Sequence, residues 1–433
     1  MLRYLDGDKK NFEKELNTIL SQRRVQNSKK SSLVKKIVFD VKKNKDTALL
    51  KYEKKFSNLK KIKLSNLKFS EKEIKNILKK LDKKTKKSID LAFDRIYLFH
   101  KKQKIKNYKV KDKYKNLMSY TSTPIEKVGI YVPGGIASYP SSVLMNCVPA
   151  IIAGVPEIYM TTPCINKDYN PAVLYAAKKC KVKEIYKVGG AQAIASLAFG
   201  TKVIKKVNKI VGPGNEYVAI AKKEVFGTVG IDMIAGPSEV TIVADKSSRP
   251  DWIASDLIAQ AEHDNFAQSI LIANDKKIIS NVNYFLRQQL KVLKKEKIAS
   301  FSLKNFGLAI FAKSKKNIIK IVNNIAPEHL EIVTSKPEKI LQSIKNAGSI
   351  FMGEYSPEAM GDYIAGTNHV LPTSGSAKFA SGLSVYDFLK RHSIIKISKT
   401  GIERLGPSVI NLAEYENLDG HANSVKIRLT GKK

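Results

Sequence analysis

The sequence predicts an α/β protein built around a doubly wound parallel sheet. From Val128 to Gly227, strand-like apolar runs alternate with helix-like runs four times within about a hundred residues. This alternation is typical of parallel strands, because neighbouring parallel strands need a long crossover connection. Gly-rich turns follow three of the strand-like runs, at Pro133–Gly135, Gly189–Gly190 and Gly212–Asn215. Ligands of such sheets bind beyond the carboxyl ends of the strands, so these turns mark the expected binding edge.

The first hundred residues are predicted to be helical and to carry no chemistry. Residues 1–25 predict one short amphipathic helix, with Phe12, Leu16 and Leu20 at helical spacing. Further Lys-rich helices with apolar stripes are expected between residues 29 and 100. A short terminal helix cannot bury its apolar face alone, so it must dock on another part of the assembly.

The second half of the chain repeats the alternation. The expected elements are, in order, a strand at Glu239–Asp245, a helix from Pro250 to Asp264, a strand at Ser269–Ala273, a strand within 303–314, a helix at 315–325 and a short strand at Leu330–Val333. A tail with two short helices ends the chain, and it is also too small for a core of its own.

Composition limits the class of protein. The length of 433 residues predicts two or three domains, and no apolar run reaches the ~18 residues of a membrane span. The three cysteines lack CxxC spacing and the N-terminus lacks a secretory signal, so a cytoplasmic protein is the simplest interpretation. The formal charge of +38 favours either nucleic-acid binding or a compositional lysine bias. The lysines are spread rather than striped and no nucleic-acid motif occurs, which favours the bias.

Several polar residues have the chemistry of a site. Asp256, Gln260 and His263 lie four and three residues apart and would share one helix face, which is half of a possible metal site. A lone histidine on such a face is more often an ordinary surface residue. Glu328 and His329 occupy a turn, where both side chains can reach one cleft although neighbours on a strand cannot. The Gly-rich stretch 348–373 carries Asp362 and His369 and is typical of a functional loop, and Glu416 and His421 flank a turn in the tail.

The sequence leaves open whether the Gly-rich turns bind a dinucleotide. No GxGxxG occurs, and the run from Gly212 departs from it by Tyr217. No acidic residue closes the second strand to hold a ribose. A nucleotide would therefore have to use helix N-termini and backbone N–H groups in a non-standard way.

Nine motifs in order resemble the histidinol dehydrogenase family. The two that carry most of the resemblance are IDMIAGPSEV from Ile231 and SDLIAQAEHD from Ser255. The others are GIYVPGG, SSVLMN, GGAQAIA, GPGN, NIAPEHLE, GDYIAGTNHVLPT and GHANSV. The resemblance covers residues 25 to 427, and its departures are the charge, the Lys-rich first hundred residues and Cys147.

The resemblance implies an architecture. The implied architecture consists of two incomplete Rossmann-like doubly wound domains, with helical terminal segments that embrace the partner of a homodimer. An NAD-binding domain would span 127–237, inserted into an outer domain made of 26–126 and 238–380 that carries the zinc and catalytic residues. Residues 1–25 would be a dimer-contact helix, and residues 381–433 a tail that contributes to the partner's active site.

The resemblance also implies an activity and its residues. The reaction would be the zinc-dependent, four-electron oxidation of L-histidinol to L-histidine through histidinaldehyde, using two NAD⁺ and one Zn²⁺ per subunit. The implied zinc ligands are Gln260, His263, Asp362 and His421. The implied substrate contacts are these four with Ser238, His329, His369 and Glu416. The implied NAD⁺ contacts are Tyr131, Gln192 and Asn215. Glu328 and His329 would be the catalytic pair, with His329 taking the alcohol proton and Glu328 activating water.

Three other functions or mechanisms would each explain part of the sequence. A zinc hydrolase of the same fold would explain a metal site without a cofactor. A nucleic-acid-binding protein would explain the charge. Catalysis through a cysteine thiohemiacetal would explain aldehyde oxidation. Cys147, Cys164 and Cys180 have no neighbouring histidine that would lower a thiol pKa, so we expect no cysteine catalysis.

Overall fold

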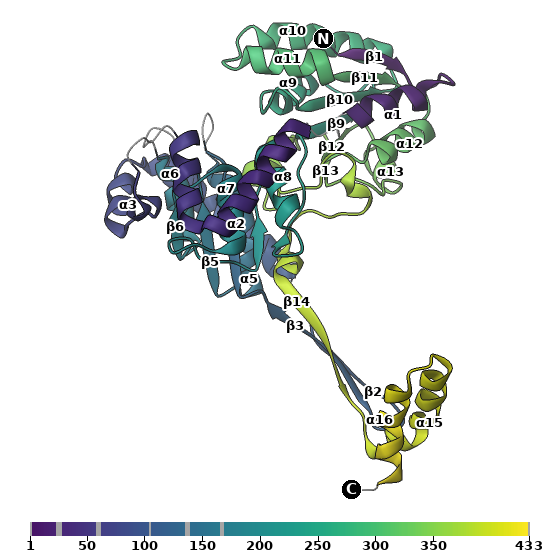
Figure 1. Ribbon diagram of the computed structural model, residues 1–433. Helices are drawn as coiled ribbons and strands as arrows, with labels where there is room; N and C mark the ends of the chain where they lie inside the picture. The colour runs from purple at the N-terminus through teal and green to yellow at the C-terminus, as the bar shows by residue number, and fades with distance from the viewer. Residues whose placement is uncertain are drawn as a thin grey trace.

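The computed structural model describes residues 2–22, 28–57, 62–103, 105–134, 139–164 and 169–431. It consists of two α/β bodies and a long arm that ends in a helical pair (Figure 1). Gly135, the last residue of the expected Pro133–Gly135 turn, lies outside the described residues. In the described part of the chain, no helix is both long and apolar enough to span a bilayer.

The first body contains a five-stranded parallel sheet. Its strands are β4 (Lys127–Tyr131), β5 (Glu157–Thr161), β6 (Glu184–Tyr186), β7 (Lys209–Val211) and β8 (Gly230–Ile231). The crossover helices are α5 (Pro140–Ala153), α6 (Pro171–Lys179), α7 (Gly190–Phe199) and α8 (Glu216–Val225). The spatial order is β6-β5-β4-β7-β8, and every pair is parallel. This is the Rossmann order without its sixth strand, and the order reverses between β4 and β7.

The second body repeats this topology. Its strands are β9 (Glu239–Ala244), β10 (Gln268–Ala273), β11 (Leu308–Phe311), β12 (His329–Val333), β13 (Ser349–Met352) and the N-terminal β1 (Arg3–Asp6). The spatial order is β1-β11-β10-β9-β12-β13, all parallel, so the five strands from β9 onward follow the same order as the first sheet. The prediction of two incomplete Rossmann-like units is confirmed.

The helices of the second body differ from the expected ones at two places. They are α9 (Pro250–Ala261), α10 (Lys276–Leu290), α11 (Glu296–Phe306) and α12 (Lys315–Ile325). The strand expected within 303–314 is shorter because residues 303–306 belong to α11. The helix expected to reach Asp264 ends at Ala261, because the chain must turn there to enter β10. His263 therefore lies in a turn rather than on the helix.

The N-terminal segment also differs from the single helix expected over 1–25. It begins with β1, which pairs with β11 and covers what would otherwise be an open sheet edge. The helix α1 (Phe12–Gln22) follows, and Phe12 and Leu16 are buried against the second sheet of the same chain. The apolar face of α1 is thus covered within the chain.

The assignment of residues 26–126 to the outer domain needs correction. The helices α2 (Ser28–Phe56), α3 (Glu71–Leu78) and α4 (Lys83–His100) pack on the first body (Figure 1). Leu49 of α2 shares a core with residues of α7 and α8, and Ile96 of α4 shares a core with β4 and α5. The apolar stripes of these helices match the outer faces of the crossover helices, which decides where they dock.

An antiparallel ribbon carries the tail away from both bodies (Figure 1). The ribbon consists of β2 (Tyr108–Lys111), β3 (Leu117–Pro124) and β14 (Leu389–Lys396), in the order β14-β3-β2. The two helices expected in the tail are present as α15 (Lys399–Tyr415) and α16 (Asp419–Thr430), which pack on each other. Leu412 and Tyr415 of α15 are 62% and 87% exposed in the single chain.

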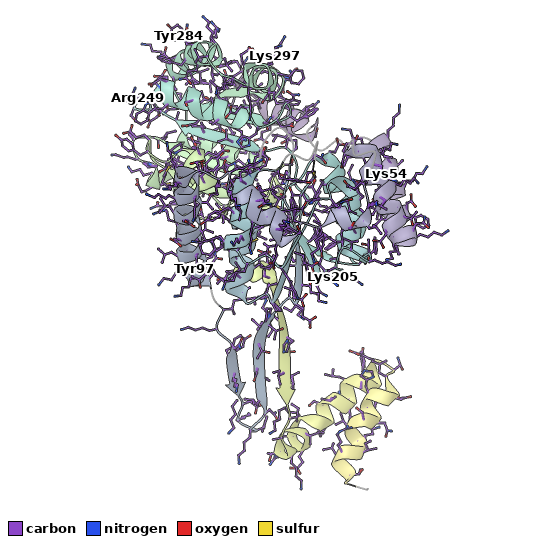
Figure 2. The ribbon with its side chains drawn as sticks, turned by 90° about the vertical axis from the view of Figure 1, so that its left-hand side faces the viewer. Lys54, Tyr97, Lys205, Arg249, Tyr284 and Lys297 are labelled. Carbon is purple, nitrogen blue, oxygen red and sulfur yellow. The ribbon has the colours of Figure 1, made fainter. Side chains whose placement is uncertain are left out.

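Exposed lysines occur on both bodies. Lys54, Lys205 and Lys297 point to solvent from separate parts of the two bodies (Figure 2).

Candidate functional site

The amino ends of β9 and β12 hold the expected catalytic pair. Glu239 begins β9, and its N–H donates to Oε2 of Glu328 at 2.9 Å. Its carbonyl lies 3.2 Å from Nδ1 of His329. A carbonyl can only accept, so Nδ1 of His329 carries the proton and Nε2 keeps its lone pair. The backbone of Glu239 thus orients both side chains of the expected catalytic pair, and both are buried.

His329 has the properties of a neutral base. Burial lowers the pKa of its imidazole to about 4. Its Nε2 is buried without a hydrogen-bond partner among the described residues, and lies 4.0 Å from Oδ1 of Asp362. The ring therefore points an unprotonated nitrogen toward the carboxylate that is expected to hold zinc.

A group of possible metal ligands lies next to this nitrogen. His263 follows α9, and Glu358 and Asp362 lie one turn apart on α14 (Glu358–Tyr363). Their donor atoms all lie within 4.8 Å of one another. The structure thus brings together two of the expected zinc ligands, His263 and Asp362, and adds Glu358. The i, i+4 spacing of Glu358 and Asp362 on one helix face is the sequence signal that could have identified Glu358.

Gln260 supports a metal at this position. It is fully buried one turn before His263, and neither amide atom has a hydrogen-bond partner among the residues described. A buried amide without partners is costly, so a ligand that engages its oxygen would relieve that cost. Imidazole nitrogen with amide and carboxylate oxygens forms a donor set that fits Zn²⁺.

The loop with His369 joins the site to the first body. Nδ1 of His369 donates to the backbone carbonyl of Asp362 at 2.9 Å, which fixes this ring as well. The neighbouring Asn368 donates from its amide to the carbonyl of Met145 in α5, at 2.7 Å. Ser238 directly precedes β9 and is partly exposed beside the catalytic pair.

Two expected site residues lie elsewhere in the single chain. Glu416 and His421 belong to the helical pair at the end of the arm, and both are exposed. Figure 1 shows this pair far from β9, α9 and β12. One chain therefore assembles all of the expected catalytic, metal and substrate residues except these two.

Three carboxyl groups lie near His329, and the sequence drew a prediction only for Asp256 among them. Oε1 of Glu358 is 3.5 Å from Nδ1 of His329, and the backbone N–H of Glu358 donates to Glu331 at 2.7 Å. Burial raises the pKa of Glu331 and of Glu358, and raises that of Asp256 to about 6. Glu331 follows His329 by two residues, so the two side chains lie on the same face of the strand. This spacing is the sequence signal that could have identified Glu331.

The expected cofactor residues lie at the carboxyl edge of the first sheet. Tyr131 ends β4, and its hydroxyl accepts from the N–H of Gly190 at 3.1 Å, while burial raises its pKa to about 12. Asn215 caps α8 and is exposed. Gln192, in the first turn of α7, donates from its amide to Glu53 of α2 at 2.8 Å. These residues flank the point where the strand order reverses, which is the usual ligand position in such sheets.

Gly212 allows the turn after β7 to lie directly against the end of β4. Its φ is 113°, and a Cβ built there would lie 2.1 Å from the carbonyl oxygen of Tyr131. The turn after β7 therefore approaches the end of β4 more closely than any side chain would permit.

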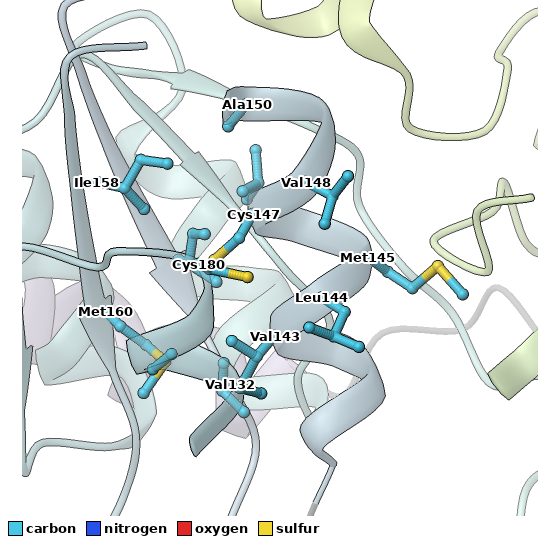
Figure 3. Packing of buried hydrophobic residues seen from close by; sticks show 14 of the residues in the cluster. Val132, Val143, Leu144, Met145, Cys147, Val148, Ala150, Ile158, Met160 and Cys180 are labelled. Atoms are coloured by element: carbon cyan, nitrogen blue, oxygen red, sulfur yellow. The ribbon is translucent and has the colours of Figure 1, made fainter. Parts of the chain in front are cut away.

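The cysteines are core residues. Figure 3 shows Cys147 on α5 and Cys180, which follows α6, beside Val143 and Ile158. Cys147, Cys164 and Cys180 are buried, and burial raises the pKa of the Cys147 thiol. A buried thiol with a raised pKa is a poor nucleophile, which favours the expectation that no cysteine takes part in catalysis.

Comparison with known proteins identifies the family. Residues 20–429 match the family model for histidinol dehydrogenase. The chain is 58% identical over 433 residues to histidinol dehydrogenase of Pelagibacter ubique, covering 100% of both, and 48% identical over 428 residues to that of Brucella suis, covering 99% of both. The crystal structure of histidinol dehydrogenase from Elizabethkingia anophelis matches with a TM-score of 0.93 and 36% identity, covering 99% of this chain and 98% of that one. The chain belongs to the histidinol dehydrogenase family.

Proposed function

We propose that this oxidoreductase converts L-histidinol to L-histidine through histidinaldehyde, at the end of histidine biosynthesis, with two NAD⁺ consumed per turnover. The observation that carries the proposal is the orientation of His329. Its Nδ1–H is held by the carbonyl of Glu239 and its free Nε2 points at the metal-ligating group. Membership of the family supplies the substrate class.

Zinc would be held by Gln260, His263 and Asp362, with His421 of the partner subunit as the fourth ligand. When bound, zinc would supply a Lewis acid that orients the imidazole and amino nitrogens of histidinol. Glu358 lies within reach of the same donor group and is a further oxygen donor. The orphaned amide of Gln260 is the structural observation that supports this ligand set.

His329 and Glu328 divide the proton chemistry between them. In the first oxidation, Nε2 of His329 takes the alcohol proton while hydride leaves the carbon for NAD⁺, giving the aldehyde and NADH. In the second, Glu328 takes a proton from water as the water oxygen bonds to the aldehyde carbon, which gives the ionised hydrate. Hydride then leaves that carbon for a second NAD⁺, and the resulting carboxylic acid loses its remaining proton to solvent to give the carboxylate. The N–H of Glu239 holds Glu328 in place for this role.

NAD⁺ would bind at the carboxyl edge of the first sheet, against Tyr131, Gln192 and Asn215. The first turns of α7 and α8 would supply backbone N–H groups there, beside the point where the turn at Gly212 approaches β4. This compensates for the missing GxGxxG fingerprint.

The remaining substrate contacts would be Ser238 and His369 with Glu416 of the partner subunit, in a cytoplasmic homodimer with shared sites. The exposed apolar residues of the arm, including Leu412 and Tyr415, support its burial against a second chain. No specific nucleic acid and no membrane partner are part of the proposal.

The test is a histidinol assay with a metal control. Zinc-loaded protein with L-histidinol and NAD⁺ should give an NADH absorbance rise, with two NADH formed per histidine. Chelation should abolish it, and added Zn²⁺ should restore it. No absorbance rise with zinc-loaded protein would refute the dehydrogenase, and an unchanged rate after proven metal removal would refute the role of zinc.

A further inference from the structure

We propose that Glu53, on α2, is a positioning residue of the nucleotide site that sets the orientation of the Gln192 amide and holds the Gly189–Gly190 turn. The inference rests on the proposed function, because Gln192 is assigned there to NAD⁺. The sequence drew no attention to α2, which was predicted to carry no chemistry.

The contacts of Glu53 converge on the start of α7. Its Oε1 accepts from the amide nitrogen of Gln192 at 2.8 Å and from the N–H of Gly189 at 3.4 Å. Its Oε2 accepts from the hydroxyl of Ser57 at 2.6 Å. A side chain 136 residues earlier in the chain thus binds both the turn after β6 and the first turn of α7.

Burying the carboxyl group of Glu53 costs free energy that simple packing does not explain. Glu53 is 0% exposed, and the ion pairs of the described residues include none with it. Burial raises its pKa, as expected for a carboxyl group without a cation. An apolar residue would pack α2 against α7 without this cost, so the hydrogen bonds of Glu53 must serve something other than packing.

Those hydrogen bonds determine which way the Gln192 amide faces. Oε1 of Glu53 faces the N–H of Gly189, which can only donate, so Oε1 acts as an acceptor and the NH₂ of Gln192 points to it. The amide oxygen of Gln192 then lies beside the turn, 3.0 Å from where a Cβ on Gly190 would be. Gln192 therefore offers an acceptor at the turn, suited to a hydroxyl or amine donor of a nucleotide.

The turn itself is held from two sides. Glu53 accepts from the N–H of Gly189, and the hydroxyl of Tyr131 accepts from the N–H of Gly190. Tyr131 and Gln192 are both expected cofactor contacts, so Glu53 completes a network that fixes them relative to each other. Fixing the site in advance lowers the ordering cost when a ligand binds.

Two substitutions separate positioning from packing. In Glu53→Gln, the amide oxygen can replace Oε1 and the amide nitrogen can donate to Ser57, so every bond has a substitute. In Glu53→Met, length and burial are kept but both acceptors are lost. We expect Glu53→Met to raise KM for NAD⁺ roughly ten-fold and to leave KM for histidinol within about two-fold, while Glu53→Gln stays within about three-fold for both.

A purely structural role would give a different result. It would lower the unfolding temperature of Glu53→Met and change both KM values together. Such a result, or an unchanged KM for NAD⁺ in folded Glu53→Met, overturns the inference. If Glu53→Met does not fold, Glu53→Asp withdraws the carboxyl group by one methylene. We then expect at least a three-fold rise in KM for NAD⁺ alone, and no rise refutes the positioning role.

The inference can fail separately from the proposed function. Calorimetric titration of the wild-type protein and both variants with NAD⁺ reads the same site without turnover. Weaker NAD⁺ binding in Glu53→Met with an inactive wild type would support the inference and refute the dehydrogenase. Normal turnover in the wild type with equal NAD⁺ affinity in all three proteins would refute the inference and support the dehydrogenase.

Discussion

The backbone of Glu239 contacts both side chains of the proposed catalytic pair. Its carbonyl fixes His329 in the tautomer with a free Nε2, and its N–H engages one carboxylate oxygen of Glu328. A neutral imidazole with a pKa of about 4 is present as base throughout the neutral range. The carboxylate and the imidazole are thus held on one edge but can be tested separately.

His329→Asn should abolish the base while keeping its anchor. The asparagine amide can still donate to the carbonyl of Glu239, but it has no basic nitrogen in place of Nε2. We expect kcat for histidinol to fall about 10²- to 10⁴-fold with zinc content unchanged. Steady-state kinetics with metal analysis checks this, and kcat near the wild-type value would rule out His329 as the base.

Glu328→Gln should separate the two oxidations. The glutamine oxygen can still accept from the N–H of Glu239, but it cannot take a proton from water. We expect zinc and histidinol to bind normally and oxidation of added histidinaldehyde to slow about 10²- to 10⁴-fold. Loss of the metal, or normal aldehyde turnover, would show that its role is assigned wrongly.

At the scale of elements, the two sheets share a strand order but use opposite edges. The proposed nucleotide contacts Tyr131 and Asn215 follow the carboxyl ends of β4 and β7, as the topology predicts. The proposed catalytic pair instead lies at the amino ends of β9 and β12, together with the end of α9 and the short helix α14. In the proposed function, one fold thus supplies the cofactor edge in one body and the chemistry in the other.

The turn at Gly212 tests the cofactor edge. Gly212→Ala places a Cβ 2.1 Å from the carbonyl of Tyr131 at a φ of 113°. Gly227→Ala is the matched control, because its φ is also positive, at 92°, but nothing lies within 4 Å of the added Cβ. We expect both to lose about 1–2 kcal/mol of stability through backbone strain, and only Gly212→Ala to lose more and to weaken NAD⁺ binding. Thermal unfolding and NAD⁺ titration measure this, and equal behaviour of the two variants would contradict it.

At the scale of the whole molecule, the arm decides whether a single chain has a complete site. The ribbon of β2, β3 and β14 holds α15 and α16 away from both bodies, and with them Glu416 and His421 (Figure 1). The helical pair presents apolar side chains to solvent in the single chain. A second copy that buries this face would bring His421 of the partner subunit to the zinc ligands.

Complementation tests this arrangement. Gln260→Ala and His421→Asn should each be inactive alone. If His421 acts on the partner subunit, a mixed dimer has one site with both defects and one site with neither, so mixing should restore activity. Differently tagged subunits verify the exchange. If no activity returns after subunit exchange has been proven, the shared site is refuted. The ligand assignment is not refuted, because a site formed within one chain would retain one of the two defects.

The sequence by itself determined the alternation of strands and helices, the Gly-rich turns and the motifs that carry the family. It also predicted a turn at Glu328 and His329, but only Glu328 lies in the bend, because His329 is the first residue of β12. The patterns that the sequence reveals are local. Only the tertiary structure decided the strand orders, the docking of α2 to α4 on the first body, and the strand β1. It alone revealed the contacts of the Glu239 backbone with Glu328 and His329 and the hydrogen bond between Glu53 and Gln192. Each of these depends on contacts between residues far apart in the chain, such as the 139 positions between Glu53 and Gln192, and no local periodicity encodes such contacts.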